Sequence, residues 1–132
     1  MAAARRSMRV TRLYTGDDLR SHFEDFEVQM DDRGAIGWLS ERHRVTSLIF
    51  RHTDADYDYT WHNAPERQYI VILEGGLDVE IGDGTRRRFG PGDILLAEDV
   101  TGQGHISRAV DGKPRRSLFI TIDPTPLENS AP

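Results

Sequence analysis

The sequence predicts an all-β fold, an antiparallel barrel with little helix. Five apolar or β-branched runs are separated by segments rich in glycine, proline and aspartate. The runs recur at a spacing of about eight to twelve residues, which is typical of antiparallel sandwiches and barrels. Helical signal is scarce. Residues 15–26 begin with a helix-like cap and acidic residues, but their apolar positions equally suit a turn that feeds a strand.

The individual strands are predicted from composition and alternation. Residues 45–50 are rich in β-branched and apolar side chains, and residues 69–73 are fully apolar, as expected for a strand buried on both faces. Residues 77–81 alternate apolar and acidic side chains, which gives a strand with one face toward water. Residues 94–97 and 118–122 complete the set.

The segments between these runs have the chemistry of turns. Residues 74–76 (Glu-Gly-Gly) are predicted to close one hairpin. Residues 82–84 contain the Asp-Gly pair favoured in tight hairpin turns, because both residue types tolerate a positive φ. Residues 90–93 (Gly-Pro-Gly-Asp) make a third turn.

The chain of 132 residues is predicted to form one domain, a barrel over residues 10–123 between flexible tails at 1–9 and 124–132. It contains no cysteine, which excludes disulfides and a thiol nucleophile and fits a cytoplasmic location. The net charge of −5 argues against a nucleic-acid partner. No apolar run approaches the ~18 residues of a transmembrane helix, and the N-terminus has no apolar signal region, so we expect no membrane partner.

Two segments, residues 61–76 and 90–105, resemble the two motifs of the cupin superfamily. His62 lies at the position of the first motif's first histidine, and Gln68 lies at the position of its glutamate. The Gly-Pro-Gly-Asp turn opens the second motif, and His105 lies at that motif's histidine. The resemblance implies a small single-domain cupin, a jelly-roll or double-stranded β-helix barrel, with its site in the lumen. It also implies a homodimer.

The chain departs from the cupin motif at two ligand positions. Ala64 stands where the second histidine is usual, and Gln68 replaces an anionic ligand with a neutral amide. By resemblance, His62, His105 and Gln68 would hold a divalent metal such as Fe, Ni, Zn, Cu or Mn. The alternative is a metal-free pocket in which the two imidazoles bind substrate or serve as acid and base near neutral pH.

Strand alternation predicts the composition of the pocket. Gln68, Ile70 and Ile72 share one strand face, and His105 shares a face with Ser107. A lumen with a polar end above an apolar floor is typical of a small-molecule site. Ile70, Ile72 and Ser107 are predicted to bind substrate. His62, His105 and Gln68 are predicted to be catalytic.

Aromatic and charged residues near the motifs are further candidates. Tyr57, Tyr59 and Trp61 alternate, so they are predicted to form either an aromatic pocket wall or part of the core or dimer interface. Tyr59 and Glu98 are candidates for proton transfer. The alternative for Glu98 is a solvated loop or an ion pair. Arg67 would hold a substrate carboxylate or form a surface ion pair.

Two functions from different classes fit these residues. The first is a cupin-type enzyme with lyase, isomerase, cyclase or dioxygenase chemistry on a small oxygenated or carbonyl-bearing metabolite. The second is a ligand-binding or sensing barrel without chemistry, which the lost histidine and glutamate favour. A third, structural role through the outer sheet would require exposed apolar edges.

Overall fold

The computed structural model describes residues 7–123, which form twelve β-strands and one short 3-10 helix. The elements are β1 (Met8–Thr15), β2 (Ser21–Val28), β3 (Asp31–Asp32), η1 (Gly34–Ile36), β4 (Trp38–Leu39), β5 (Val45–Thr53), β6 (Asp58–His62), β7 (Gln68–Glu74), β8 (Leu77–Glu80), β9 (Arg86–Phe89), β10 (Ile94–Glu98), β11 (His105–Ala109) and β12 (Arg115–Ile122).

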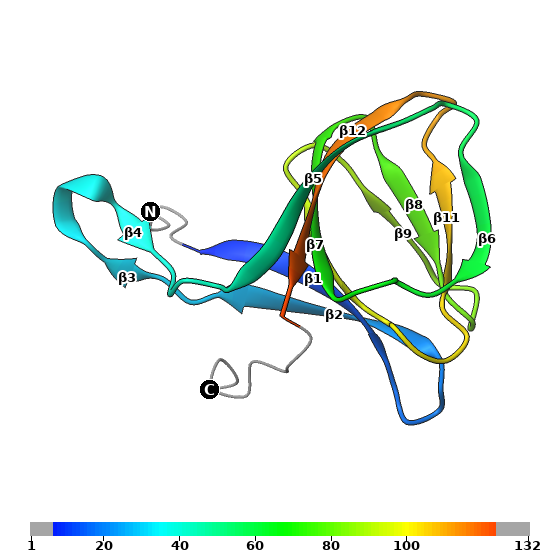
Figure 1. Ribbon diagram of the computed structural model, residues 1–132, viewed down its shortest axis with the longest axis horizontal. Coiled ribbons are helices and arrows are strands. Elements are labelled where there is room, and N and C mark those ends of the chain that lie inside the picture. Colours follow the sequence, from blue (N-terminus) through cyan, green and yellow to red (C-terminus); the bar gives the residue numbers. More distant parts are fainter. Residues whose placement is uncertain (1–6, 124–132) are drawn as a thin grey trace, which may run out of the picture.

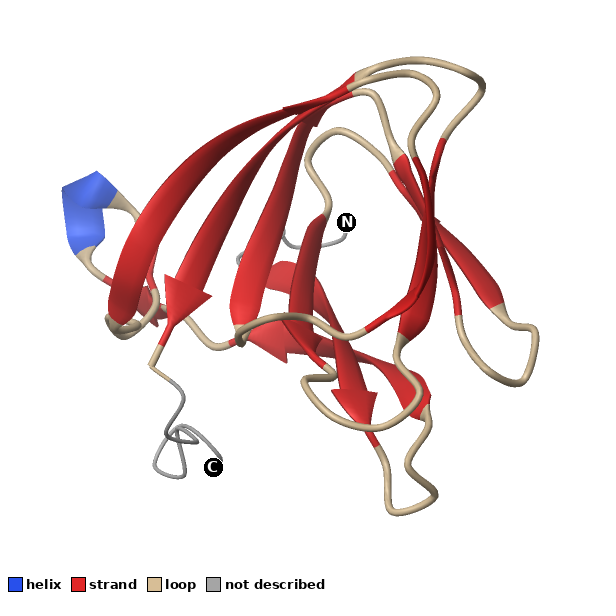
Figure 2. Cartoon of the chain, turned by 45° about the vertical axis from the view of Figure 1, so that its right-hand side comes forward, coloured by secondary structure: helices blue, strands red, loops and turns tan. Residues whose placement is uncertain are grey.

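Two sheets face each other to make the barrel (Figures 1 and 2). The six-stranded sheet has the order β2-β1-β10-β7-β12-β5, and the four-stranded sheet has the order β6-β11-β8-β9. All paired strands are antiparallel except β1 and β10, which run parallel. The predicted all-β barrel with little helix is confirmed, with this one parallel pair as an addition. The segment at residues 15–26, for which a helix and a turn feeding a strand were both open, forms a turn followed by strand β2 (Ser21–Val28).

The turns direct the chain between the two sheets. Residues 82–84 close the predicted hairpin, which joins β8 to β9, and Gly84 has the expected positive φ of 88°. The prediction of a hairpin at residues 74–76 is wrong. This turn carries the chain from β7 in the large sheet to β8 in the small one, because those two strands pair with other partners. Residues 90–93 make the return crossing to β10.

The main hydrophobic core lies between the sheets. Leu13, Ile72, Val79 and Leu95 are each at most 1% exposed and pack in one cluster. The strand at residues 69–73 is buried fully on only one face, whereas burial on both faces was predicted. Its inward side chains are buried, but Leu73 is 53% exposed, because nothing among the described residues covers the outer face at that end.

The N-terminal strand and an arm extend beyond the predicted limits of the barrel. Strand β1 begins at Met8, two positions before the predicted domain start. Residues 1–6 of the predicted N-terminal tail (1–9) and the whole predicted C-terminal tail (124–132) lie outside the described residues. Strands β3 and β4 form an arm that projects away from the barrel (Figure 1). Within residues 7–123, no helix is long and apolar enough to cross a membrane.

Candidate active site

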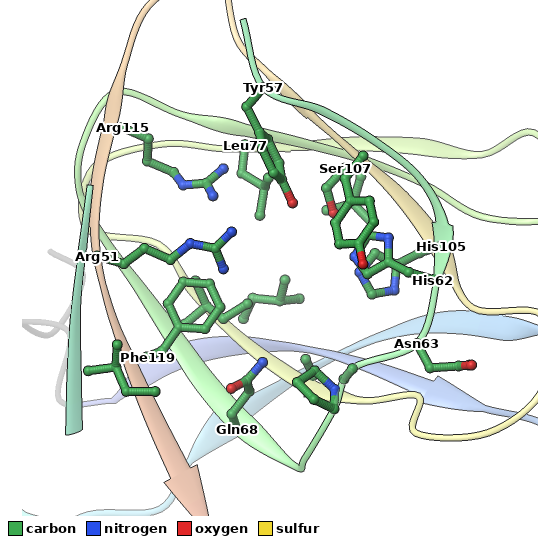
Figure 3. Close-up of a pocket in the computed structure, with 18 residues that line it drawn as sticks. Arg51, Tyr57, His62, Asn63, Gln68, Leu77, His105, Ser107, Arg115 and Phe119 are labelled. Carbon is green, nitrogen blue, oxygen red and sulfur yellow. The ribbon is translucent and has the colours of Figure 1, made fainter. Parts of the chain in front are cut away.

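A cavity of about 320 Å³ lies between the two sheets (Figure 3). Its walls come from both sheets and combine apolar side chains with a few polar ones. The site residues predicted from the sequence that line it are Tyr57, Tyr59, His62, Gln68, Ile70, His105 and Ser107. The predicted site residues that do not line it are Trp61, Arg67, Ile72 and Glu98.

His105 is held by a buried carboxylate. Its Nδ1–H donates a hydrogen bond of 2.6 Å to Oδ2 of Asp99, whose residue is 0% exposed. The hydroxyl of Ser21 donates to the same oxygen at 2.7 Å. Because Nδ1 is occupied, Nε2 is the nitrogen of His105 that remains to act in the cavity. A carboxylate in this position fixes the tautomer and the orientation of an imidazole.

His62 lies beside His105 and is kept neutral. Its Nδ1–H donates a hydrogen bond of 2.6 Å to the carbonyl of Thr60, and its ring stacks on Tyr59 with centroids 3.8 Å apart. The two imidazole centroids are 4.4 Å apart. Burial lowers the pKa of His62, and the neighbouring His105 lowers it further. His62 therefore presents a neutral ring to the cavity at neutral pH.

The close approach of the two histidines depends on a glycine. Gly104 has a φ of 78°, and a Cβ at this position would lie 2.0 Å from the carbonyl oxygen of His62. Only glycine combines this backbone conformation with this contact. Gly104 thus allows the loop before β11 to pass against the end of β6.

A bulge in β6 explains why Trp61 is absent from the cavity. His105 pairs with His62 while Ser107 pairs with Tyr59, so β6 has one more residue than β11 over this stretch. The extra residue reverses the alternation of side chains. Tyr59 and His62 consequently both face the cavity, and Trp61 is 39% exposed. Trp61 therefore does not line this cavity, and its role as a substrate contact stays a prediction.

Glu98 and Arg67 pair with each other away from the cavity. Glu98 accepts hydrogen bonds from Nε of Arg67 at 2.6 Å and from Nε of Arg12 at 2.5 Å. Ala97 lines the cavity, so the next side chain along the strand points to the opposite face. The structure therefore favours the ion-pair alternative for Glu98 and for Arg67 over roles in proton transfer and substrate binding. The carboxylate that reaches the site is that of Asp99.

Of two residues predicted to line the pocket from β7, Gln68 lies in the cavity wall and Ile72 lies in the core. Gln68 lines the cavity from β7 in the large sheet, whereas His62 and His105 belong to the small sheet (Figure 3). Ile70 contributes to the floor as predicted. Ile72 is 1% exposed in the core cluster and does not reach the cavity, because it lies one further alternation along β7. Its role as a substrate contact stays a prediction that its position in the core does not favour.

Sequence reasoning missed two arginines of the cavity. Arg51 enters from β5 and Arg115 enters from β12, on the side opposite the imidazoles (Figure 3). Arg115 is only 2% exposed. Alternation along β12 places Arg115 on the same face as Phe119. Phe119 points into the cavity, so this alternation would have predicted Arg115 there as well.

The residues present form an incomplete set of metal ligands. Residues 7–123 contain no group of three His, Cys, Asp or Glu side chains placed to hold a metal ion. The predicted set offers two imidazoles and the neutral amide of Gln68, so it lacks the anionic ligand of the usual two-histidine, one-carboxylate site. This set fits a divalent metal poorly, and metal binding through these three residues stays a prediction.

Three solved structures are similar to the chain. The protein NMB1881 from Neisseria meningitidis has 15% sequence identity and a TM-score of 0.46, over 63% of this chain and 84% of that one. The conserved SPY1581 protein of unknown function from Streptococcus pyogenes has 19% identity and a TM-score of 0.48, over 74% and 77% of the two chains. The Cnp3 cupin domain from Schizosaccharomyces pombe has 14% identity and a TM-score of 0.42, over 96% and 90%.

No protein-family model matches the chain, and no curated protein matches it. Its fold is recognised instead from the architecture. Two facing sheets exchange the chain at residues 74–76 and 90–93, and the two cupin-like motifs bring His62 and His105 together in the lumen. The fold of this chain is therefore cupin-like, as predicted.

Proposed function

We propose that this chain is a small-molecule enzyme of the cupin type that transfers protons within the barrel lumen. The observation that carries the proposal is the buried Asp99–His105 pair, whose second imidazole nitrogen is left for the cavity. Neutral His62 and the phenol of Tyr59 stand beside it. General acid–base catalysis requires this kind of paired, oriented group within reach of a bound substrate.

The division of roles follows from the hydrogen bonds. Nε2 of His105 accepts a proton from a carbon or oxygen next to a carbonyl group, and the Asp99 carboxylate stabilises the resulting imidazolium. The His105 imidazolium then returns this proton to another atom of the product, or Tyr59 donates its phenol proton there and is reprotonated by His105. Such steps serve lyase, isomerase and cyclase reactions. They are favoured over dioxygenase chemistry because the donor set lacks an anionic metal ligand.

The test is proton exchange with solvent. Carbonyl-bearing metabolites with an acidic C–H are incubated with the protein in D2O, and deuterium incorporation and product formation are followed by NMR. We expect the wild type to label or convert at least one compound and His105→Asn to lose that activity. A His52→Asn control, which changes an exposed imidazole outside the cavity, should retain it.

The second candidate is a ligand-binding barrel without chemistry. Ala64 and Gln68 favour it, because they remove a metal ligand and an anion while leaving a cavity. Saturable binding of a panel compound with neither label nor product would support this candidate. It would also overturn the enzyme proposal.

A further inference from the structure

Two guanidinium groups face the cavity from the wall opposite the imidazoles (Figure 3). The Arg51 guanidinium lies 4.6 Å from the ring centroid of Phe119 and 5.7 Å from that of Tyr57. The Arg115 guanidinium lies 5.2 Å from the Tyr57 centroid. The cavity thus has a cationic end on β5 and β12 and an imidazole end on β6 and β11.

Arg115 is buried without an anionic partner among residues 7–123. Its Nε and Nη1 are buried and have no hydrogen-bond partner among these residues, whereas its Nη2 donates to Oγ1 of Thr53 at 3.3 Å and the guanidinium also interacts with Tyr57. Within residues 7–123, no carboxylate forms an ion pair with Arg115 or Arg51. Burial is the main cause that lowers the pKa of Arg115, and Tyr57 partly opposes it.

Of the twelve other arginines among residues 7–123, seven pair with a carboxylate, namely Arg12, Arg67, Arg86, Arg87, Arg88, Arg108 and Arg116. The other five, Arg9, Arg20, Arg33, Arg42 and Arg44, are exposed to solvent. A buried guanidinium without a counter-charge is strongly unfavourable in a folded protein. The unpaired donors of Arg115 are therefore best explained by an anion that enters from outside the chain.

We propose that the ligand of the cavity is a small organic carboxylate, whose anionic group is held by Arg115 and Arg51. Arginine matches the planar, two-oxygen geometry of a carboxylate. The apolar side chains between the two ends, from Ile70, Leu77, Val79 and Leu95, would contact the hydrocarbon body of the ligand. A cavity of about 320 Å³ suits a metabolite at the small end of the range for ligand sites.

This inference rests on the proposed function and names its substrate class. With the carboxylate held on β5 and β12, the body of the ligand extends toward the small sheet. The atom of the ligand from which a proton would be removed, next to a carbonyl group, then lies toward His62 and His105. Recognition and chemistry are assigned to opposite walls, so they can be tested with separate variants.

The binding test uses carboxylates and their neutral amides. Propionate, phenylacetate and 4-hydroxybenzoate, their amides and inorganic phosphate are titrated into the full chain by calorimetry. We expect at least one carboxylate to bind in the millimolar range or tighter, with its amide at least about 10-fold weaker. Arg115→Gln and Arg51→Gln should each weaken that binding by about 10- to 100-fold.

Arg116 supplies a matched control for these variants. It adjoins Arg115 on β12 but points outward to an exposed pair with Glu74, at 3.7 Å. Arg116→Gln should bind the carboxylate as the wild type does. Equal binding of acid and amide, binding of phosphate alone, or no binding of any carboxylate would overturn the inference.

The melting temperature of an Arg115 variant distinguishes an arginine that binds a ligand from one that only stabilises the fold. Arg115→Met replaces the unpaired charge with an apolar side chain of similar length, so the variant should melt at a higher temperature than the wild type and lose carboxylate binding. A lower melting temperature would assign Arg115 a structural role and overturn the inference.

The proton-exchange assay separates this inference from the proposed function. Exchange on neutral carbonyl compounds without carboxylate binding would refute the carboxylate ligand but not the enzymatic function. Carboxylate binding that depends on Arg115, without exchange or turnover, would refute the enzymatic function but not the carboxylate ligand. His105→Asn is expected to catalyse no exchange, whereas Arg116→Gln is expected to keep both carboxylate binding and exchange.

Discussion

Oδ2 of Asp99 lies 2.6 Å from Nδ1 of His105, so a carboxylate that follows a strand of the large sheet orients an imidazole at the start of a strand of the small sheet. Asp99 comes directly after β10, and His105 opens β11. The pair therefore spans the two sheets at the edge of the cavity. Its geometry depends on the loop at residues 100–104 as much as on either strand.

Asp99→Asn should reduce turnover far more than binding. The amide keeps the size of the side chain but cannot stabilise an imidazolium on His105, so we expect proton exchange to fall by about 10²- to 10⁴-fold. Calorimetric binding of the ligand should change by less than about 10-fold. Asp56→Asn, which changes an exposed carboxylate, is the control. Loss of binding and exchange to the same extent would show that Asp99 only maintains the fold.

His62 should make the protein less stable as the pH falls. Burial lowers its pKa in the folded state, so the unfolded chain binds more protons than the folded one just below the ordinary histidine range. The free energy of unfolding should therefore decrease from about pH 7 to pH 5. The free energy of unfolding is measured by urea unfolding at several pH values across this range. Its dependence on pH should be weaker in His62→Gln than in the wild type, whereas the exposed His52→Gln should keep the wild-type dependence. An unchanged dependence in His62→Gln would contradict the prediction.

Glu98→Gln should lower stability and leave function intact. The Glu98 side chain is 10% exposed and serves Arg12 and Arg67 together, so removing its charge should cost about 1–3 kcal/mol in the free energy of unfolding. Exchange and binding should not change, because Glu98 is outside the cavity. The exposed Glu74→Gln should cost less than about 1 kcal/mol. A large loss of exchange with normal stability in Glu98→Gln would restore it as a catalytic residue.

Elemental analysis should decide the metal prediction. The donor set of His62, His105 and Gln68 lacks an anion, so we expect purified protein to contain transition metal well below one ion per chain. His62→Ala and His105→Ala should leave that trace content unchanged. One ion per chain, lost in both variants, would establish the metal centre that the cupin resemblance implies.

We propose a homodimer that covers the edge strand β5. This strand ends the large sheet, and its Leu48 and Phe50 are 52% and 79% exposed. Exposed apolar edges of this kind are usually covered by another chain. Light scattering after size-exclusion chromatography should give a dimer for the wild type and a monomer for Phe50→Asp, with Val100→Asp as the control for an added surface charge. A wild-type monomer, or a dimer unaffected by Phe50→Asp, would refute this interface.

The sequence by itself determined the all-β class, five of the twelve strands, the turns at 82–84 and 90–93, and the meeting of His62 with His105. These features follow from local patterns: alternation, turn residues and the spacing of two motifs. The presence of Gln68 and Ile70 in the cavity walls was also predictable, because they alternate along the regular strand β7. Tyr57, Tyr59 and Ser107 line the cavity as predicted, although Tyr57 precedes β6 and the other two flank its bulge.

Only the tertiary structure decided which neighbours of those residues face the cavity. One extra residue in β6 turns Trp61 outward, and the alternation along β10 selects Asp99 over Glu98. Arg115 is buried because β12 lies between β5 and β7. A local pattern fixes the period of a strand, but its inward face and the point where a bulge reverses it depend on pairing with strands distant in the chain.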